Sequence, residues 1–269
     1  MPIHYEERDH VALITIDRPD RKNSLDLFHF SDLAKAWKRF RDDENMWVAI
    51  VTGVDDSFCA GADLRDFIPQ VTRFQEAIQS GEKTEFEGVD IKDSVYAVLR
   101  NVKLYKPIIA AVNGPCVAGG MEMLGGVDIR IACPEAVFGV LEPASGLFAG
   151  GGTTVRLPRQ ISYPHAMEFL LTADKFPATR ALEMGLINEI VERDQLLDRA
   201  FEWAARITRN APLAIQATKE SVHRGLAAEN LAEAYAIEQE LSAKIFKTED
   251  AREGPKAFTE KRTPNWQAR

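Results

Sequence analysis

Two glutamates are the first candidates for chemistry in this 269-residue chain. Glu122 and Glu142 each follow an apolar stretch, in a segment that carries few charges. A carboxyl group in apolar surroundings has a raised pKa, which suits proton transfer near neutral pH. If folding brings the two together, they could act as general base and general acid. The alternative is that backbone donors satisfy both, at a helix start and at a strand end, and the spacing alone favours this simpler interpretation.

Backbone N–H groups are the second candidate. The Gly119-Gly120 pair precedes helix-forming residues, so it can begin a helix whose first N–H groups face a ligand. Small residues also surround Gly61, where a ligand oxygen could approach the main chain. The N–H groups of Ala62 and Gly119 could together form an oxyanion hole. Taken alone, the turn at Gly61 is an ordinary strand-to-helix connection.

Glycine is unevenly distributed, since ten of the 17 glycines lie between Gly114 and Gly152. A core does not require such clustering, so the backbone in this segment must approach something closely.

Sequence motifs for other kinds of catalytic or binding site are absent. The sequence lacks HExxH, HxxxH, CxxC, a GxGxxG after a strand, GxxxxGK[ST] and GxSxG, so we predict no metal, dinucleotide, Walker-type or serine-nucleophile site.

The composition is that of a globular protein, with 45% apolar and 28% charged residues. The net charge of −8 argues against a sequence-independent nucleic-acid coat but allows a locally held anion. Cys59, Cys116 and Cys133 are odd in number and lie in apolar surroundings, which favours a reduced, cytoplasmic compartment. No secretory signal is visible, and the longest uncharged run, 107–121, is too short and too broken to span a membrane.

Strands and helices must position these groups. Helical spacing of apolar residues predicts a helix over 27–40 that Ser24 caps. Beyond about Pro164 the strand signal ends and helices follow, so we predict an α/β core with a helical C-terminal part. The predicted strands are Val11–Ile16, Val48–Thr52, Ile108–Val112 and Asp128–Ala132, and the later helices are 164–172, 178–185, 194–208, 212–224 and 229–246.

The region 63–104 is polar, lacks clear strands and is interrupted by Gly81 and Gly88. Its pattern is that of either a mobile helical insertion or a lid, and periodicity cannot choose between them.

In their order along the chain, the motifs resemble the crotonase, or enoyl-CoA hydratase/isomerase, superfamily. The resemblance covers nearly the whole chain. It is carried by Ile16–Leu25, Phe58–Leu64, Lys106–Gly114, Ala118–Glu122, Asp128–Ala132, Phe138–Glu142, Gly150–Thr153, Arg156–Pro158 and Glu253–Arg262.

The resemblance implies a spiral of ββα units over 1–195 and a C-terminal helical region over 196–269 that forms a homotrimer, or a hexamer built as a dimer of trimers. It also implies an enoyl-CoA hydratase. Ala62 and Gly119 match the residues whose N–H groups hold the thioester oxygen. Glu122 matches the group that activates water for addition to the β-carbon, and Glu142 the group that gives a proton to the α-carbon.

Coenzyme A is implied as part of the thioester substrate, with no prosthetic group, no metal, no nucleic-acid partner and no membrane. Arg21 and Lys22 occupy the loop that meets the adenine and ribose-phosphate end in the family. Phe258 and Lys261 match a contribution that commonly comes from a neighbouring subunit. The remaining implied substrate contacts are Ala60, Asp63, Leu64, Arg65 and Gly150.

The chain departs from the family pattern in several places, one of which is the stretch Glu142–Phe148. Val140 replaces a common glutamine, Ala149 replaces a proline, and 63–104 is longer than in compact members. We therefore hypothesise a bulky acyl group, branched, aromatic or polycyclic. A Δ3-Δ2 enoyl-CoA isomerase, a dehydratase or a C–C hydrolase could use the same oxyanion hole, but isomerases commonly need one carboxylate.

Two alternatives come from other classes of protein. Some relatives bind RNA through a lysine-rich first helix, and here the predicted first helix carries Lys35, Lys38, Arg39 and Arg41. Acidic residues flank these cations, which is typical of a solvated helix face. A catalytically silent scaffold is the other alternative, and the intact glutamate pair argues against it.

Overall fold

A six-stranded sheet forms the centre of the fold in the computed structural model, which describes residues 3–80, 85–86 and 89–269. The strand order is β1-β2-β3-β6-β8-β11; β1 pairs antiparallel with β2, and the other pairings are parallel. Buried apolar residues form most of β2, β3 and β6, as expected for strands covered on both faces. The strands are β1 (Ile3–Arg8), β2 (Val11–Ile16), β3 (Val48–Gly53), β6 (Ile108–Val112), β8 (Ile129–Ala132) and β11 (Glu189–Ile190).

A second, three-stranded sheet has the order β10-β9-β7. It consists of β7 (Cys116–Val117), β9 (Val137–Gly139) and β10 (Phe176–Pro177). The four predicted strands are confirmed. The expectation that strands end near residue 164 is wrong, because β10 and β11 lie beyond it. Strands of two residues are too short to show the alternation that reveals a strand in a sequence.

Helix α1 (Leu27–Asp42) packs its apolar face into the core, where Leu33, Trp37 and Phe40 are fully buried. The helix is confirmed, but the predicted cap is wrong. Asp26, in extended conformation, accepts a hydrogen bond from the N–H of His29 at 2.9 Å, whereas Ser24 lies in the preceding turn and accepts from Arg18.

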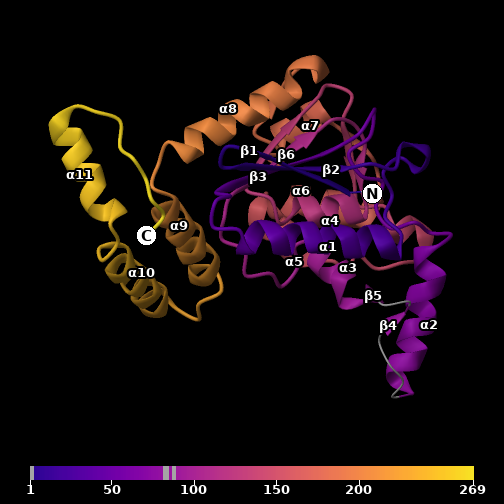
Figure 1. Ribbon diagram of the computed structural model, residues 1–269. Coiled ribbons are helices and arrows are strands. Elements are labelled where there is room, and N and C mark those ends of the chain that lie inside the picture. Colours follow the sequence, from indigo (N-terminus) through magenta and orange to yellow (C-terminus); the bar gives the residue numbers. More distant parts are fainter. Residues whose placement is uncertain (1–2, 81–84, 87–88) are drawn as a thin grey trace.

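The region 63–104 contains α2 (Phe67–Gln79), a ribbon of β4 (Glu85–Phe86) and β5 (Val89–Asp90), and α3 (Lys92–Ala97). The ribbon corrects the expectation of a region without strands. Gly81 and Gly88 lie outside the described residues. Asp93 joins α3 to α1 by accepting hydrogen bonds from Ser31 and Lys38, whereas α2 projects from the body (Figure 1).

Helices follow the sheet strands in the rest of the chain. Leu196, Ala200 and Ala204 of α8 are buried against the sheet, whereas α10 and α11 stand to one side of the body (Figure 1). The predicted α/β core with a helical C-terminal part is confirmed. These helices are α4 (Gly119–Leu124), α5 (Thr153–Gln160), α6 (Tyr163–Thr172), α7 (Ala178–Glu183), α8 (Leu196–Thr208), α9 (Pro212–Gly225), α10 (Leu231–Ile245) and α11 (Asp250–Glu260), with 3-10 turns η1 (Pro19–Arg21), η2 (Glu142–Ser145) and η3 (Arg193–Gln195).

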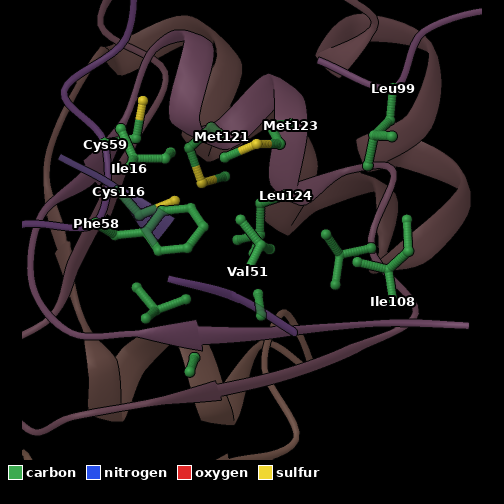
Figure 2. Close-up of a cluster of buried hydrophobic side chains, with 14 of the residues drawn as sticks. Ile16, Val51, Phe58, Cys59, Leu99, Ile108, Cys116, Met121, Met123 and Leu124 are labelled. Carbon is green, nitrogen blue, oxygen red and sulfur yellow. The ribbon is translucent and has the colours of Figure 1, made fainter. Parts of the chain in front are cut away.

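The core fixes the position of α4. Met121 and Leu124 of this helix point toward Phe58 and Val51 (Figure 2), and all four side chains are buried. Because interiors are close-packed, α4 cannot shift without opening a cavity beneath it. The first turn of α4 and Glu122 are therefore held on a rigid base.

Candidate active site

Two turns from different parts of the chain meet at the start of α4. Cys59 forms an isolated parallel bridge with Cys116, and Leu25 forms another with Ala62. A Cβ placed on Gly61, whose φ is +87°, would lie 2.7 Å from the Gly119 nitrogen. Only glycine can take this conformation without strain and admit such a close neighbour. The glycine at 61 thus brings the N–H groups of Ala62 and Gly119 side by side.

These two N–H groups are free. Within the described part of the chain, neither that of Ala62 nor that of Gly119 donates a hydrogen bond, whereas the neighbouring groups are paired. Asp63 donates to the carbonyl of Leu25 at 2.8 Å, and Ala118 donates to that of Gly139 at 2.9 Å. Fixed donors of this kind can stabilise negative charge that develops on a carbonyl oxygen.

Glu122 projects from α4 against the glycine loop. The N–H of Gly151 donates to Glu122 Oε1, and a Cβ on Gly151 would lie 2.1 Å from Glu122 Oε2, so this approach requires glycine. Burial raises the pKa of Glu122, while the Gly151 hydrogen bond and the charges of Arg100 and Arg156 lower it. Burial is the larger effect, so the pKa of Glu122 is raised overall, and these partners limit the rise.

Glu142 begins η2, and its Oε2 is buried without a hydrogen-bond partner among the described residues. Its pKa is raised to about 7, mainly by burial and in part by the charge of Glu122. The two carboxyl groups therefore lie within electrostatic range of each other. Such a pair can hold one carboxylate and one carboxylic acid at neutral pH.

The predicted CoA loop lies beside the Gly61 turn. The N–H of Ala60 donates to the carbonyl of Lys22 at 3.1 Å, so this loop and this turn are hydrogen-bonded neighbours. Arg21 and Lys22 are exposed, and Lys22 pairs with Asp56 at 2.9 Å. Exposed ion pairs of this type contribute little stability, so Lys22 is available to another anion.

The residues after Ala62 differ in their surroundings. Asp63 is buried, pairs with Arg18 at 3.0 Å and accepts from the N–H of Arg65, so it holds the turn in shape. Leu64 and Arg65 are exposed. Gly150 donates to the carbonyl of Phe148 at 2.8 Å and is half-buried.

Phe258 and Lys261 are not brought to this site within one chain. Both are exposed. Phe258 belongs to α11 and Lys261 is the residue directly after it, and Figure 1 shows α11 well away from α4. Val140 and Ala149, which depart from the family pattern, are both buried.

Two arginines beside Glu122 were not predicted as site residues, although Arg156 begins one of the family motifs. Arg156 Nη1 donates to the carbonyl of Glu122 at 3.2 Å, and Arg100 Nη1 donates to that of Gly150. The signal that could have found Arg156 is the Gly125-Gly126 pair, because a Cβ on Gly125 would lie 3.2 Å from Arg156 Cδ. Nothing in the sequence around Arg100 indicates its contact.

Neither a metal site nor a membrane span emerges from residues 3–80, 85–86 and 89–269. No group of three or more histidines, cysteines or acidic residues is placed to hold a metal ion there, and no helix is long and apolar enough to cross a bilayer.

Comparison with known proteins identifies the family. Residues 6–269 match the enoyl-CoA hydratase/isomerase family model. An enoyl-CoA hydratase of Mycobacterium tuberculosis is 40% identical over 266 residues, covering 98% of this chain and 96% of that protein. The (E)-benzylidenesuccinyl-CoA hydratase of Thauera aromatica is 37% identical over 265 residues, with 98% of each chain covered. A crystal structure of an enoyl-CoA hydratase from Mycobacterium tuberculosis superposes with a TM-score of 0.85 at 36% identity, covering 100% of this chain and 99% of that one. The resemblance drawn from the motifs is thus confirmed, and the chain belongs to the enoyl-CoA hydratase/isomerase family, with its crotonase fold.

Proposed function

We propose that the protein adds water across the 2,3-double bond of a trans-2-enoyl-CoA to give a 3-hydroxyacyl-CoA. The observation that carries the proposal is the pairing of two free N–H groups, of Ala62 and Gly119, with two buried carboxyl groups. Two carboxyl groups suit water chemistry, which needs a base at one carbon and an acid at the next.

In this mechanism ionised Glu122 takes a proton from water as the oxygen bonds to the β-carbon. The electron pair of the double bond moves into the thioester, whose oxygen becomes the enolate oxygen. The N–H groups of Ala62 and Gly119 stabilise that charge, by about 3 kcal/mol for each donor. Protonated Glu142 then gives its proton to the α-carbon, in keeping with its raised pKa.

The CoA end of the substrate is assigned to exposed cations. Arg21 and Lys22 would meet the adenine and ribose-phosphate end, and Arg65, which follows the turn that carries Ala62, would lie toward the pantetheine arm; all three are exposed. Phe258 and Lys261 would come from a neighbouring subunit of a homotrimer or of a hexamer built from two trimers. Exposed apolar side chains on and beside α9 and α10 support such an assembly; they are Val222, Leu226, Leu231, Tyr235 and Phe246.

Three free, buried cysteines support a cytoplasmic location.

The acyl group is proposed to be bulky. Leu64, which is 56% exposed, and α2 follow directly after Ala62, so they lie near a thioester held at that turn. Val140 offers no hydrogen bond where many hydratases have a glutamine. The similarity to a hydratase of benzylidenesuccinyl-CoA, which carries an aromatic acyl group, also supports this proposal.

RNA binding receives no support from α1. Its four cations, Lys35, Lys38, Arg39 and Arg41, each pair with a carboxylate, at 2.8, 2.7, 2.5 and 2.6 Å. They form a solvated, internally neutralised helix face rather than a free basic patch.

The proposal is tested by following the loss of the conjugated thioester absorbance of enoyl-CoAs. Glu122→Gln and Glu142→Gln should each lower kcat by at least about 100-fold, because each removes a proton-transfer group. Glu135→Gln is the matched control, since Glu135 is an exposed glutamate of the same segment, paired with Arg193 at 3.4 Å. Product mass separates hydration, which adds one water, from isomerisation, which adds nothing. Near-normal turnover in both test variants would contradict the mechanism.

A further inference from the structure

One peptide group lies between a cation and the proposed base. Arg100 Nη1 donates to the carbonyl oxygen of Gly150, and the N–H of Gly151, which belongs to the same peptide group, donates to Glu122 Oε1. The oxygen end of a peptide dipole is negative and its N–H end is positive. The guanidinium and the carboxylate therefore lie at the two ends that favour them, and each hydrogen bond strengthens the other.

The backbone around Arg100 has a special conformation. Leu99 and Asn101, on either side, have φ of 58° and 57°, in the left-handed region that non-glycine residues rarely adopt. Arg156 secures this turn, because it donates to the carbonyls of Val98 at 3.1 Å and of Leu99. Such strain is retained where surrounding contacts hold it, and it is concentrated at functional sites.

The same arginine connects the turn to α4. Arg156 Nη1 also donates to the carbonyl of Glu122, so the backbone of Glu122 and the turn at 98–101 are bound to one guanidinium. A Cβ on Gly126 would lie 2.5 Å from Leu99 Cβ, which explains why glycine follows α4 there. The turn that presents Arg100 is thus docked directly on the helix that carries Glu122.

Among the residues that the structure describes, the charged and titratable groups that face Glu122 are few. They are Cys59, Glu142, Arg100 and Arg156. Burial raises the pKa of Cys59 to about 12, so that thiol stays neutral. The two arginines are the cations that act on Glu122, and of these Arg156 is largely buried while Arg100 is exposed. Removing the Arg100 charge therefore leaves no cavity in the core.

We infer that Arg100 is a positioning residue that acts through the Gly150–Gly151 peptide group to hold the Glu122 carboxylate ionised and correctly directed. This inference rests on the proposed role of Glu122 as the base. Without the guanidinium, the Gly151 N–H is less polarised and its bond to the carboxylate weakens. Glu122 then takes up a proton more readily and is lost as a base at the acid end of the pH range.

The kinetic test compares kcat/KM against pH for Arg100→Gln, Arg100→Lys and Arg159→Gln. Arg159 is the matched control, because it is an exposed arginine that donates to the carbonyl of Val155 within α5. For Arg100→Gln we expect about tenfold loss on the acid limb and less than about twofold on the alkaline side. Arg100→Lys should retain most of the acid limb, and Arg159→Gln should coincide with the wild type. An equal loss at every pH, or an unchanged acid limb, would overturn the inference.

A second readout needs no turnover. The Glu122 carboxyl carbon is titrated by NMR in unliganded protein labelled with ¹³C at glutamate, and its signal is assigned by its absence from Glu122→Gln. Arg100→Gln should move this titration to higher pH, and Arg159→Gln should not. An unchanged titration overturns the positioning role of Arg100 even if the enzyme is an active hydratase. A shifted titration supports the positioning role of Arg100 even if no enoyl-CoA is hydrated. The inference about Arg100 and the proposed hydratase function can therefore fail separately.

Discussion

At the scale of single residues, burial acts alike on the two carboxyl groups, and their partners distinguish them. Apolar surroundings predicted raised pKa values for both, and the directions of both shifts confirm this. Glu122 has compensating partners in Gly151 and two arginines, whereas Glu142 Oε2 has none among the described residues. The sequence could predict the first effect from neighbouring residues. It could not predict the compensating partners of Glu122, since Arg100 and Gly150 are far apart in the chain and meet through a backbone oxygen.

The cost of ionising Glu142 predicts a stability change. Its pKa is about 7 in the folded protein against an ordinary 4.5, so the folded state binds this proton more tightly. Stability is therefore lost as pH rises from about 4.5 to about 7. Glutamine keeps the shape of the neutral acid. At about pH 8 the free energy of unfolding of Glu142→Gln should therefore exceed that of the wild type by about 2 kcal/mol, after a discount for partial exposure. The difference should vanish near pH 4.5.

Urea denaturation at both pH values measures this change. Glu135→Gln, at an exposed position, is the control and should change stability little. A gain for Glu142→Gln that is equal at the two pH values would point to packing rather than to charge. The expected combination of higher stability and lost turnover is typical of a group kept for catalysis rather than for folding.

At the scale of elements, a strand or helix could be predicted from the sequence only where its apolar pattern is long enough. The strands β2, β3, β6 and β8 and the helices from α6 to α10 follow periodicities long enough to be recognised. The strands β7, β9, β10 and β11 span two or three residues and show no period, although β7 and β9 carry the turn before α4. The edge strand β1 was missed because its second half, toward Arg8, is polar and exposed. The ordered motifs, rather than periodicity, predicted the spiral.

The position of α2 predicts the size of the substrate. This helix follows the Ala62 turn, and Phe67 and Ile68 pack on the core while Leu64 stays exposed. Apolar surface near the acyl group favours substrates that can cover it. We expect kcat/KM for branched or aromatic 2-enoyl-CoAs to exceed that for crotonyl-CoA by at least about tenfold, which two added methylenes can supply. Saturation kinetics over a series of acyl groups measures this, and a clear preference for crotonyl-CoA would refute it.

At the scale of the whole molecule, the proposed CoA site includes residues that one chain does not bring together. The residues proposed to meet the reacting carbons lie at or near the core, whereas Phe258 lies on α11 and Lys261 directly follows it. Helix α11 is separated from α4 (Figure 1). Phe258 is 86% exposed, which is unusual for a phenylalanine that has no partner to cover it. The motifs predicted that Phe258 and Lys261 contribute to CoA binding from a neighbouring subunit. They could not show how far α11 stands from its own core, and this separation is what supports that prediction.

Mixed oligomers test this shared site. Subunits with Glu122→Gln keep an intact α11, and subunits with Phe258→Ala and Lys261→Ala keep an intact catalytic centre. Each homo-oligomer should be impaired, the first in kcat and the second by a raised KM for the CoA thioester, because Lys261 would meet a phosphate. After mixing and reassembly, some sites combine the intact centre of one subunit with the intact α11 of another, and part of the activity should return at low substrate. Activity that stays at the average of the two parents would place each CoA site within a single chain.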